Sequence, residues 1–252
     1  MIEVEFPDAK SWGGIFSSVS KIVDEITVSF KKNGVYARAM DSAHLAMVDL
    51  HIPETAFEKY TVVEEANLGI KLDDMNNVLK RAGKTDKLEL SYDPKESQLT
   101  LKFKGQIRRE FSINLIDLSE NTPAMPNLPV EVNAVVIPAA LREAVKDVGA
   151  VSDYAVFEAD QSVLVVRSKS SRGSMKLELT KESGYLLDFE YKSASKHSKA
   201  SYGIKYLEYI TSVEEAVSVG VSFSTNAPLK LDYRIPNDTQ LVYLLAPRAD
   251  ED

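Results

Sequence analysis

The side chains that most often carry catalysis are few in this chain and are not spaced for it. Its three histidines, His44, His51 and His197, show neither an HExxH pattern nor another metal-ligand spacing. It has no cysteine, which excludes thiolate nucleophiles, disulfides, iron–sulfur clusters and cysteine-based zinc sites. It also lacks a P-loop and a dinucleotide-binding glycine fingerprint. We therefore expect a protein that is not an enzyme and holds no cofactor or metal.

Two short motifs resemble functional sites but have simpler structural explanations. Asp73-Asp74 looks like a metal-binding pair, yet acidic residues at the start of a helix complement its dipole. Gly13-Gly14 lies inside a helical pattern, where close packing or a local bend is favoured over phosphate binding.

Lysine and arginine on the polar sides of the predicted helices offer a different chemistry, which is contact with phosphates. These residues are Lys10, Lys21, Lys80, Arg81, Lys84, Arg142, Lys146 and Lys205. Cations in such positions would meet a nucleic-acid backbone without reading bases. From the residues alone, an ordinary solvated helix face is the favoured interpretation of this pattern, and acids such as Asp147 and Glu208 dilute the signal. The net charge of −8 argues against a protein coated with DNA-binding surface, but it does not exclude one local basic face.

Four short helices among many hairpin strands must position these residues. Helical spacing of apolar residues predicts helices over 12–23, 72–82, 139–148 and 205–212. Alternation predicts strands over 2–6, 26–30, 35–39, 45–51, 68–72, 88–92, 99–103, 107–115, 154–159, 163–167, 175–180, 186–191, 217–223, 229–234 and 240–245. Asp8 is expected to cap the first helix, Gly83 to end the second, and Asn33-Gly34 to turn a hairpin. The prediction is an α+β fold with helices on one face of antiparallel sheets.

Internal similarity indicates that the chain is a duplication. Leu68-Gly69-Ile70-Lys71-Leu72 resembles Tyr202-Gly203-Ile204-Lys205-Tyr206, and Gly203 follows Gly69 by 134 residues. Leu99-Thr100-Leu101-Lys102-Phe103 resembles Leu229-Lys230-Leu231-Asp232-Tyr233, and Leu229 follows Leu99 by 130 residues. Two matches at nearly one offset predict two copies of a whole domain, although chance remains an alternative for such short patterns.

A proline-containing segment separates the two copies. Pro123, Pro126 and Pro129 cannot continue a helix or a central strand. We expect an extended surface connector over 117–130, between domains at 1–116 and 131–252. No stretch of 18 or more apolar residues appears and the N-terminus lacks a secretory pattern, so neither a membrane span nor a signal peptide is expected.

Four separated motifs resemble the PCNA-type DNA sliding clamps of archaea and eukaryotes. They are Gly34-Val35 with Met40-Asp41-Ser42-Ala43-His44-Leu45, the segment 72–83, Ala227-Pro228-Leu229, and Leu244-Leu245-Ala246-Pro247-Arg248 ahead of an acidic tail. The resemblance covers the whole chain in order. It departs at Leu244, where the family often has an aromatic residue, and in the connector.

The resemblance implies a DNA-clamp fold of two similar domains that assembles into a three-subunit ring around duplex DNA. All helices would face the hole, so the basic residues named above would approach the phosphates, Lys80 and Lys146 foremost. Binding would be independent of DNA sequence, and topology rather than affinity would retain the DNA.

The resemblance also implies an apolar site for short hydrophobic motifs of partner proteins. Its residues would be Met40, His44, Leu45, Met125, Leu128, Pro228, Leu244, Ala246 and Pro247. The implied partners are a replicative DNA polymerase, the clamp loader, a flap endonuclease and DNA ligase. For Met40 and Leu45 alone, a plain core position is the competing interpretation.

Ring closure would pair an edge strand of the first domain with one of the second domain of a neighbour. The residues implied are Arg109, Phe111, Ile113 and Leu115 on one strand, and Lys176, Leu177 and Leu179 on the other. The competing interpretation is that both strands lie inside one sheet.

The function that follows is a processivity factor that tethers DNA polymerase and other replication and repair enzymes to duplex DNA. A clamp loader would use ATP to open the ring. A homotrimer and a heterotrimer both remain open, as does a paralogous subunit of a heteromeric replicative or checkpoint ring. A phosphate-handling enzyme built on a duplicated fold is an alternative that no motif supports. The location would be intracellular, in the cytoplasm or nucleoid of an archaeon or in a eukaryotic nucleus.

Overall fold

Strand–helix–strand segments recur along the chain in its computed structural model, which describes residues 1–118, 122–160, 162–192 and 197–249. The first half contains β1 (Ile2–Phe6), α1 (Ala9–Val19), β2 (Glu25–Lys31), β3 (Gly34–Met40), β4 (Ala46–Pro53), the 3₁₀ turn η1 (Glu54–Ala56), β5 (Lys59–Val62), β6 (Ala66–Lys71), α2 (Leu72–Leu79), β7 (Lys87–Tyr92), β8 (Gln98–Lys104) and β9 (Arg109–Asn114). The second half contains β10 (Val132–Val136), α3 (Pro138–Val151), β11 (Tyr154–Ala159), β12 (Leu164–Ser170), β13 (Gly173–Leu179), β14 (Leu186–Tyr191), β15 (Ser198–Gly203), α4 (Ile204–Ile210), β16 (Ser218–Phe223), β17 (Leu229–Ile235) and β18 (Thr239–Leu245).

The chain divides into two compact units. The first consists of Met1–Ser42, Val48–Pro123 and Ile235–Leu241, and the second of Ala43–Met47, Ala124–Arg234 and Val242–Asp252. Each unit therefore borrows short segments from the other half of the sequence.

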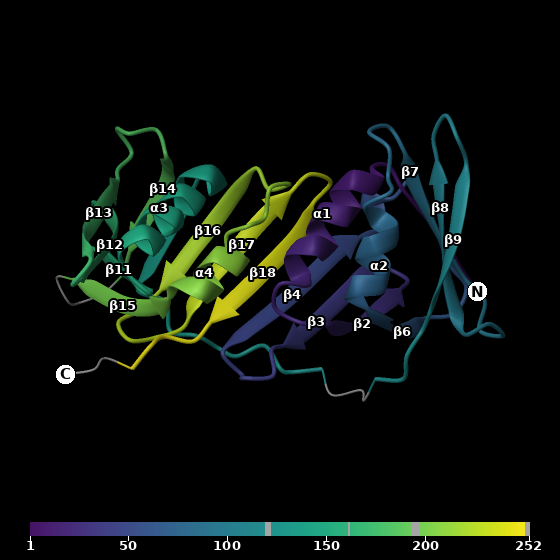
Figure 1. Cartoon of the computed structure of the whole chain (residues 1–252), viewed down its shortest axis with the longest axis horizontal. Helices are drawn as coiled ribbons and strands as arrows, with labels where there is room; N and C mark the ends of the chain where they lie inside the picture. Colours follow the sequence, from purple (N-terminus) through teal and green to yellow (C-terminus); the bar gives the residue numbers. More distant parts are fainter. Residues whose placement is uncertain (119–121, 161, 193–196, 250–252) are drawn as a thin grey trace. The chain divides into compact units, whose positions relative to one another are not determined.

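The first unit has antiparallel strands in two groups and two helices. Five strands pair in the order β5-β1-β7-β8-β9, and β2 pairs with β3 and β6. Helices α1 and α2 pack against each other and lie side by side on one face of the β3-β2-β6 strands (Figure 1).

The second unit repeats this plan. Four strands pair in the order β13-β12-β11-β15, and β10 pairs with β14 and β16, which continues to β17. Helices α3 and α4 pack against each other (Figure 1). The predicted α+β class with antiparallel sheets is thus confirmed.

Aromatic side chains fill the core of each unit. In the first unit Trp12 of α1 is 1% exposed, stacks on Phe16 at 5.1 Å and meets Phe6 edge-on at 5.3 Å. In the second, Phe157 meets Tyr202 at 5.5 Å and Phe223 at 6.2 Å. Burial of a side chain of this kind contributes about 1.5–3 kcal/mol, which explains why the apolar stripe of each helix faces its sheet.

The ends of the helices follow local chemistry. Asp8 caps α1 as predicted, because its Oδ1 accepts from the backbone N–H groups of Lys10 at 2.8 Å and Ser11 at 3.1 Å. Helix α2 ends at Leu79, earlier than predicted, and Gly83 lies in the following turn, where its N–H donates to Asp86 at 2.7 Å. Asp73 and Asp74 stand exposed in the first turn of α2, where they complement the helix dipole.

The hairpin between β2 and β3 forms, but its turn is shifted by one residue from the prediction. Lys31 pairs with Gly34, so Lys32 and Asn33 make the two-residue turn and Gly34 begins β3. Of the residues in this turn, Gly34 has positive φ, at 143°, and a Cβ there would lie 2.4 Å from the carbonyl oxygen of Ile52. A close backbone approach therefore requires this glycine.

The repeated motifs occupy equivalent elements. Strand β6 leads into α2 just as β15 leads into α4, and the second pair of motifs lies on β8 and β17. The two glycines differ in their surroundings. A Cβ at Gly69 would lie 2.1 Å from the carbonyl oxygen of Ile116, whereas nothing lies within 4 Å at Gly203. The chain that leads into the connector therefore passes close to Gly69 in the first copy, and no segment lies equally close to Gly203 in the second.

Candidate functional site

The predicted DNA-facing cations of the first unit are exposed and have no acidic partner within the described residues. Lys10 lies in α1 and Lys21 in the turn after it. Lys80 is the C-cap of α2, and Arg81 and Lys84 lie in the turn that follows. Positive charge at this end of α2 suits the helix dipole, and it is also available to an external anion.

The corresponding cations of the second unit already interact with an acidic or aromatic side chain of the same unit. Arg142 on α3 pairs with Glu214 at 3.1 Å, and its side chain is 23% exposed. Lys146 pairs with Glu143 at 2.8 Å, and this hydrogen bond lowers the pKa of the Glu143 carboxyl. Lys205 on α4 lies over the ring of Tyr209 at 6.0 Å. The two units therefore differ in the positive charge that they offer.

Most of the residues predicted to bind partners lie on three segments of the second unit. Leu45 and Met125 are 43% and 38% exposed, which is unusual for large apolar side chains. The backbone N–H of Ala246 donates to the carbonyl of Leu45 at 2.8 Å, which brings the C-terminal segment beside the 43–47 loop. His44 in that loop has positive φ, at 56°. Figure 1 shows residues 122–130 of the connector as an extended trace without helix or strand.

The remaining partner-site residues divide between exposed and buried positions. Leu128, Pro228, Ala246 and Pro247 are half-buried. Leu244 is only 6% exposed on β18 and acts as a core residue. Met40 is half-buried on β3, within the first unit.

The turn over 224–228 and the C-terminal segment share one support, strand β15. Asn226 donates its N–H to the carbonyl of Lys199 at 3.0 Å, and the Tyr202 hydroxyl donates to the carbonyl of Ala227 at 2.8 Å. Arg248 donates its N–H to the carbonyl of Ser201 at 2.7 Å, and its guanidinium lies over Tyr154 at 4.9 Å. Burial raises the pKa of the Tyr202 hydroxyl, so it stays a protonated donor.

The two strands that were predicted to join subunits are both edge strands of their sheets. Strand β9 is the last strand of its five-stranded sheet and β13 the last of its four-stranded sheet, so the alternative that they lie inside one sheet is wrong. Phe111 and Leu115 are half-buried and Ile113 is 6% exposed. On β13, Leu177 is half-buried, Leu179 is buried, and Lys176 pairs with Glu178. Each free edge thus carries partly covered apolar side chains.

Arg109 has intramolecular partners that sequence reasoning missed. Its Nη1 donates to the carbonyl of Arg81 at 2.7 Å, its Nη2 pairs with the buried Asp86, and its guanidinium lies over Phe103 at 5.3 Å. It therefore ties β9 to the turn after α2, whatever it contacts in an assembly.

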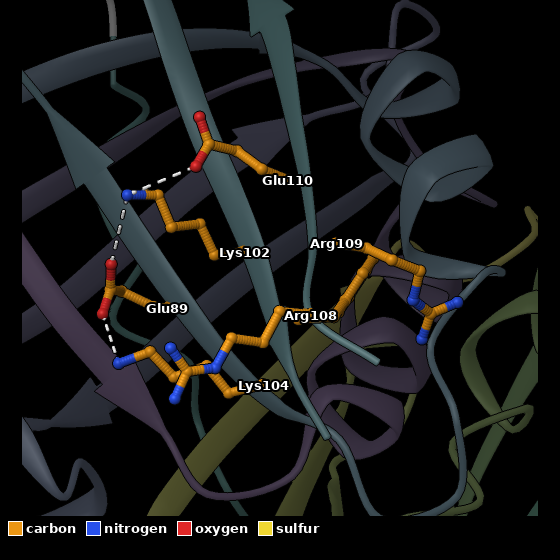
Figure 2. A pocket seen from close by; sticks show the side chains of 7 residues that line it. Glu89, Lys102, Lys104, Arg108, Arg109 and Glu110 are labelled. Carbon is orange, nitrogen blue, oxygen red and sulfur yellow. Dashed lines mark ion pairs between the residues drawn. The ribbon is translucent and has the colours of Figure 1, made fainter. Parts of the chain in front are cut away.

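A charged hollow of about 460 Å³ lies beside β9 and was also not predicted. It is lined by Glu89, Lys102, Phe103, Lys104, Arg108, Arg109 and Glu110. Glu89 lies between two lysines, at 2.5 Å from Lys104 and 3.7 Å from Lys102 (Figure 2). Lys104 also pairs with Glu5 at 2.5 Å, and Lys102 with Glu110 at 3.4 Å. Charges alternating across β1, β7, β8 and β9 largely neutralise one another there.

The geometry offers no catalytic constellation in the part of the chain that is described. No three histidine, cysteine, aspartate or glutamate side chains there come together to hold a metal. His51 stacks on Tyr36 at 4.5 Å, and His197 lies 3.8 Å from Glu158. Among the same residues, no helix has the length and apolar character needed to cross a membrane.

Comparison with known proteins finds similarity along the entire chain. A family model described as proliferating cell nuclear antigen, N-terminal domain, matches residues 1–122. The DNA polymerase sliding clamp of Thermofilum pendens is 35% identical over 252 residues, which is 99% of this chain and 100% of that protein. The crystal structure of PCNA from Thermococcus kodakaraensis has a TM-score of 0.92 at 33% identity and covers 98% of this chain and 100% of its own. The structure of the C-terminal region of FEN-1 bound to A. fulgidus PCNA has a TM-score of 0.90 at 25% identity and covers 100% of both chains.

Proposed function

This chain belongs to the PCNA family of DNA polymerase sliding clamps, and from that premise we propose that it forms a ring around duplex DNA and tethers replication and repair enzymes to it. The observation that carries this proposal is the match over 99% of the chain to proteins with that name. A processivity factor of this kind binds and positions other proteins and catalyses nothing itself. The domain boundaries at 1–116, 117–130 and 131–252 are part of the proposal.

The surface for DNA is formed by the cations of the helices. Lys10, Lys21, Lys80, Arg81 and Lys84, which are exposed and make no ion pair with any residue that the structure describes, support a role for the first unit. Such cations bind phosphates without reading bases, and this suits a protein that must slide. Arg142 and Lys146 are weaker candidates, because a carboxylate already neutralises each.

The surface for partner proteins combines the connector, the 43–47 loop, the 224–228 turn and the C-terminal segment. The relative from A. fulgidus binds the C-terminal region of FEN-1, which supports a role for this chain in holding a flap endonuclease. A DNA polymerase, DNA ligase and the clamp loader would use the same kind of short hydrophobic motif. Exposed Leu45 and Met125 supply apolar anchors, and methionine adapts to different partners.

The ring would close through strands β9 and β13 of neighbouring copies. Free sheet edges invite such pairing, and contacts between two unlike surfaces generate rings when the rotation closes. A ring of one chain repeated three times is the simplest assembly, and a mixed ring with paralogous chains is the alternative. An intracellular location at the DNA follows from this role, in a nucleoid or a nucleus.

Threading onto DNA tests the proposal directly. The purified protein is incubated with linear duplex DNA whose ends are either open or blocked beforehand by biotin–streptavidin, and the DNA is then washed at moderate salt. In the first arm the open ends are blocked after the incubation, so a ring that has threaded onto the DNA is trapped there. In the second arm the ends are blocked before the protein is added, so a ring cannot thread. Retention of the protein on the DNA should therefore occur only in the first arm. Equal retention on DNA with ends blocked beforehand would show binding by charge alone and would overturn the ring.

A further inference from the structure

A hydroxyl group helps to hold the connector where it enters the second unit, where the backbone N–H of Glu131 also donates to the carbonyl of Phe223 at 3.2 Å. The Ser224 side chain is 5% exposed, directly after β16. Its Oγ donates to the carbonyl of Pro129 at 2.7 Å and accepts from the backbone N–H of Glu131 at 3.0 Å. Because these two groups flank Val130, one side chain fixes the chain direction on both sides of that residue.

The Glu131 carboxylate strengthens this attachment. Its Oε2 accepts from the Ser198 hydroxyl at 2.8 Å and from the backbone N–H and hydroxyl of Thr225 at 3.1 and 3.3 Å. Ser198 is fully buried at the start of β15. The end of the connector is therefore bonded to the 224–228 turn and to the strand that supports both this turn and the C-terminal segment.

The connector is also held before its apolar stretch. Arg38 on β3 donates from Nη1 to the carbonyl of Pro123 at 3.4 Å, and Asp49 orients the guanidinium through an ion pair of 2.8 Å. Within the described residues no hydrogen bond reaches 124–128, the stretch that contains Met125 and Leu128. Its path is set by the attachments on its two sides.

We propose that Ser224 is a positioning residue for partner binding, which acts by holding residues 129–131 so that Met125 and Leu128 are presented to a hydrophobic peptide in a prearranged path. This inference rests on the proposed role of the connector in partner binding. A segment without hydrogen bonds of its own loses conformational freedom when a partner orders it. Fixing one end in the free protein reduces that loss, so the hydroxyl raises affinity without touching the peptide.

The test compares three variants with the parent protein. Ser224→Ala removes the hydroxyl, and Ser224→Thr retains it. Ser222→Ala is a matched control two residues earlier, on β16, because the Ser222 hydroxyl also makes a hydrogen bond, at 2.7 Å, but to Asn133 rather than to the connector. The probe is a synthetic peptide with the sequence of the FEN-1 C-terminal region that is bound to A. fulgidus PCNA, titrated by calorimetry, and amide hydrogen exchange reports the mobility of residues 124–131.

Ser224→Ala removes both hydrogen bonds of the hydroxyl and should raise the peptide Kd roughly five- to tenfold, because only part of their stabilisation is passed on to the peptide. Exchange should accelerate in the connector and remain unchanged in β10 and β16. Ser224→Thr should restore both values, and Ser222→Ala should leave both at the parental level.

Two outcomes separate this inference from the proposed function. Faster connector exchange with an unchanged Kd would overturn the positioning role and leave the partner site standing. Failure of the parent protein to bind the peptide at all would instead count against the partner site.

Discussion

The basic residues on the helices differ in whether a carboxylate already neutralises them. Lys80 stands exposed at the C-terminal end of α2 without an ion pair, whereas Lys146 on α3 is bonded to Glu143. A DNA phosphate must displace the Glu143 carboxylate before it can pair with Lys146, but it can pair with Lys80 without displacing another group. Exposed ion pairs of this kind are weak, so the difference is one of degree.

Charge reversal at these two lysines tests the difference. Lys80→Glu and Lys146→Glu change the net charge equally, so each controls for the other. Lys80→Glu should weaken binding to a short duplex and lower the slope of log K against log salt by about one. Lys146→Glu should have a smaller effect. Fluorescence anisotropy across a salt series measures both, and equal losses would contradict the assignment.

The Glu158 carboxylate on β11 gives the folded state a predictable dependence on pH. Two hydrogen bonds from Arg167, one from Nη2 and one from Nε at 2.8 Å, lower the pKa of Glu158 below its usual 4.5 and outweigh the effect of burial. Because the folded pKa is depressed, the stabilisation is complete above the unfolded value and is lost as pH falls through the folded one. Denaturant unfolding between pH 7 and pH 3 should show a steeper loss in the parent than in Glu158→Gln. Identical slopes would remove Glu158 from the linkage.

Side-chain partners were the hardest feature to predict from the sequence. Asp8 as a cap and Asp73-Asp74 at a helix start follow from local rules, and both are confirmed. The contacts of Arg109 and the burial of Leu244 were missed. A long side chain can reach several elements, and an interior strand of a sheet can bury both faces, so neither outcome can be derived from local spacing.

Strands depend on distant partners more than helices do. The four helices were predicted within a few residues, because each carries its own apolar stripe. Strands β5, β10 and β15 were not predicted. Strand β5 has four residues and exists by pairing with β1, and β10 follows the proline-containing connector and pairs with β14 and β16. Such strands are defined by tertiary pairing rather than by their own pattern.

The edge of β13 permits a test of assembly at the level of one element. Leu177 is half-buried on a free edge, and Leu187, 51% exposed on β14, is a matched apolar control away from that edge. Leu177→Asp should shift the native mass from trimer towards monomer without changing the circular dichroism spectrum, and Leu187→Asp should not. Sedimentation velocity across a range of concentrations measures this. A parent protein that stays monomeric at all concentrations would favour a mixed ring, whereas a trimer insensitive to Leu177→Asp would exclude β13 from the contact.

The whole chain behaves as two copies of one plan that have been adapted differently. The duplication was visible in the sequence, since both motif pairs occupy equivalent elements. The structural differences between the two copies could not be predicted from the sequence, because they depend on which distant segments pack against each copy. Gly69 is required by the crossing connector, while its counterpart Gly203 faces open space.

The unequal neutralisation of the helix cations has a consequence for rotation. Three chains of two similar units would give six equivalent positions around a ring if all units attracted DNA equally. Because the unpaired cations are concentrated in the first unit, a homotrimer would instead offer the duplex three favourable orientations per turn, separated by weaker ones. A duplex inside such a ring would rest against one first unit at a time and pass to the next as it rotates, so its axis would be displaced from the centre of the ring.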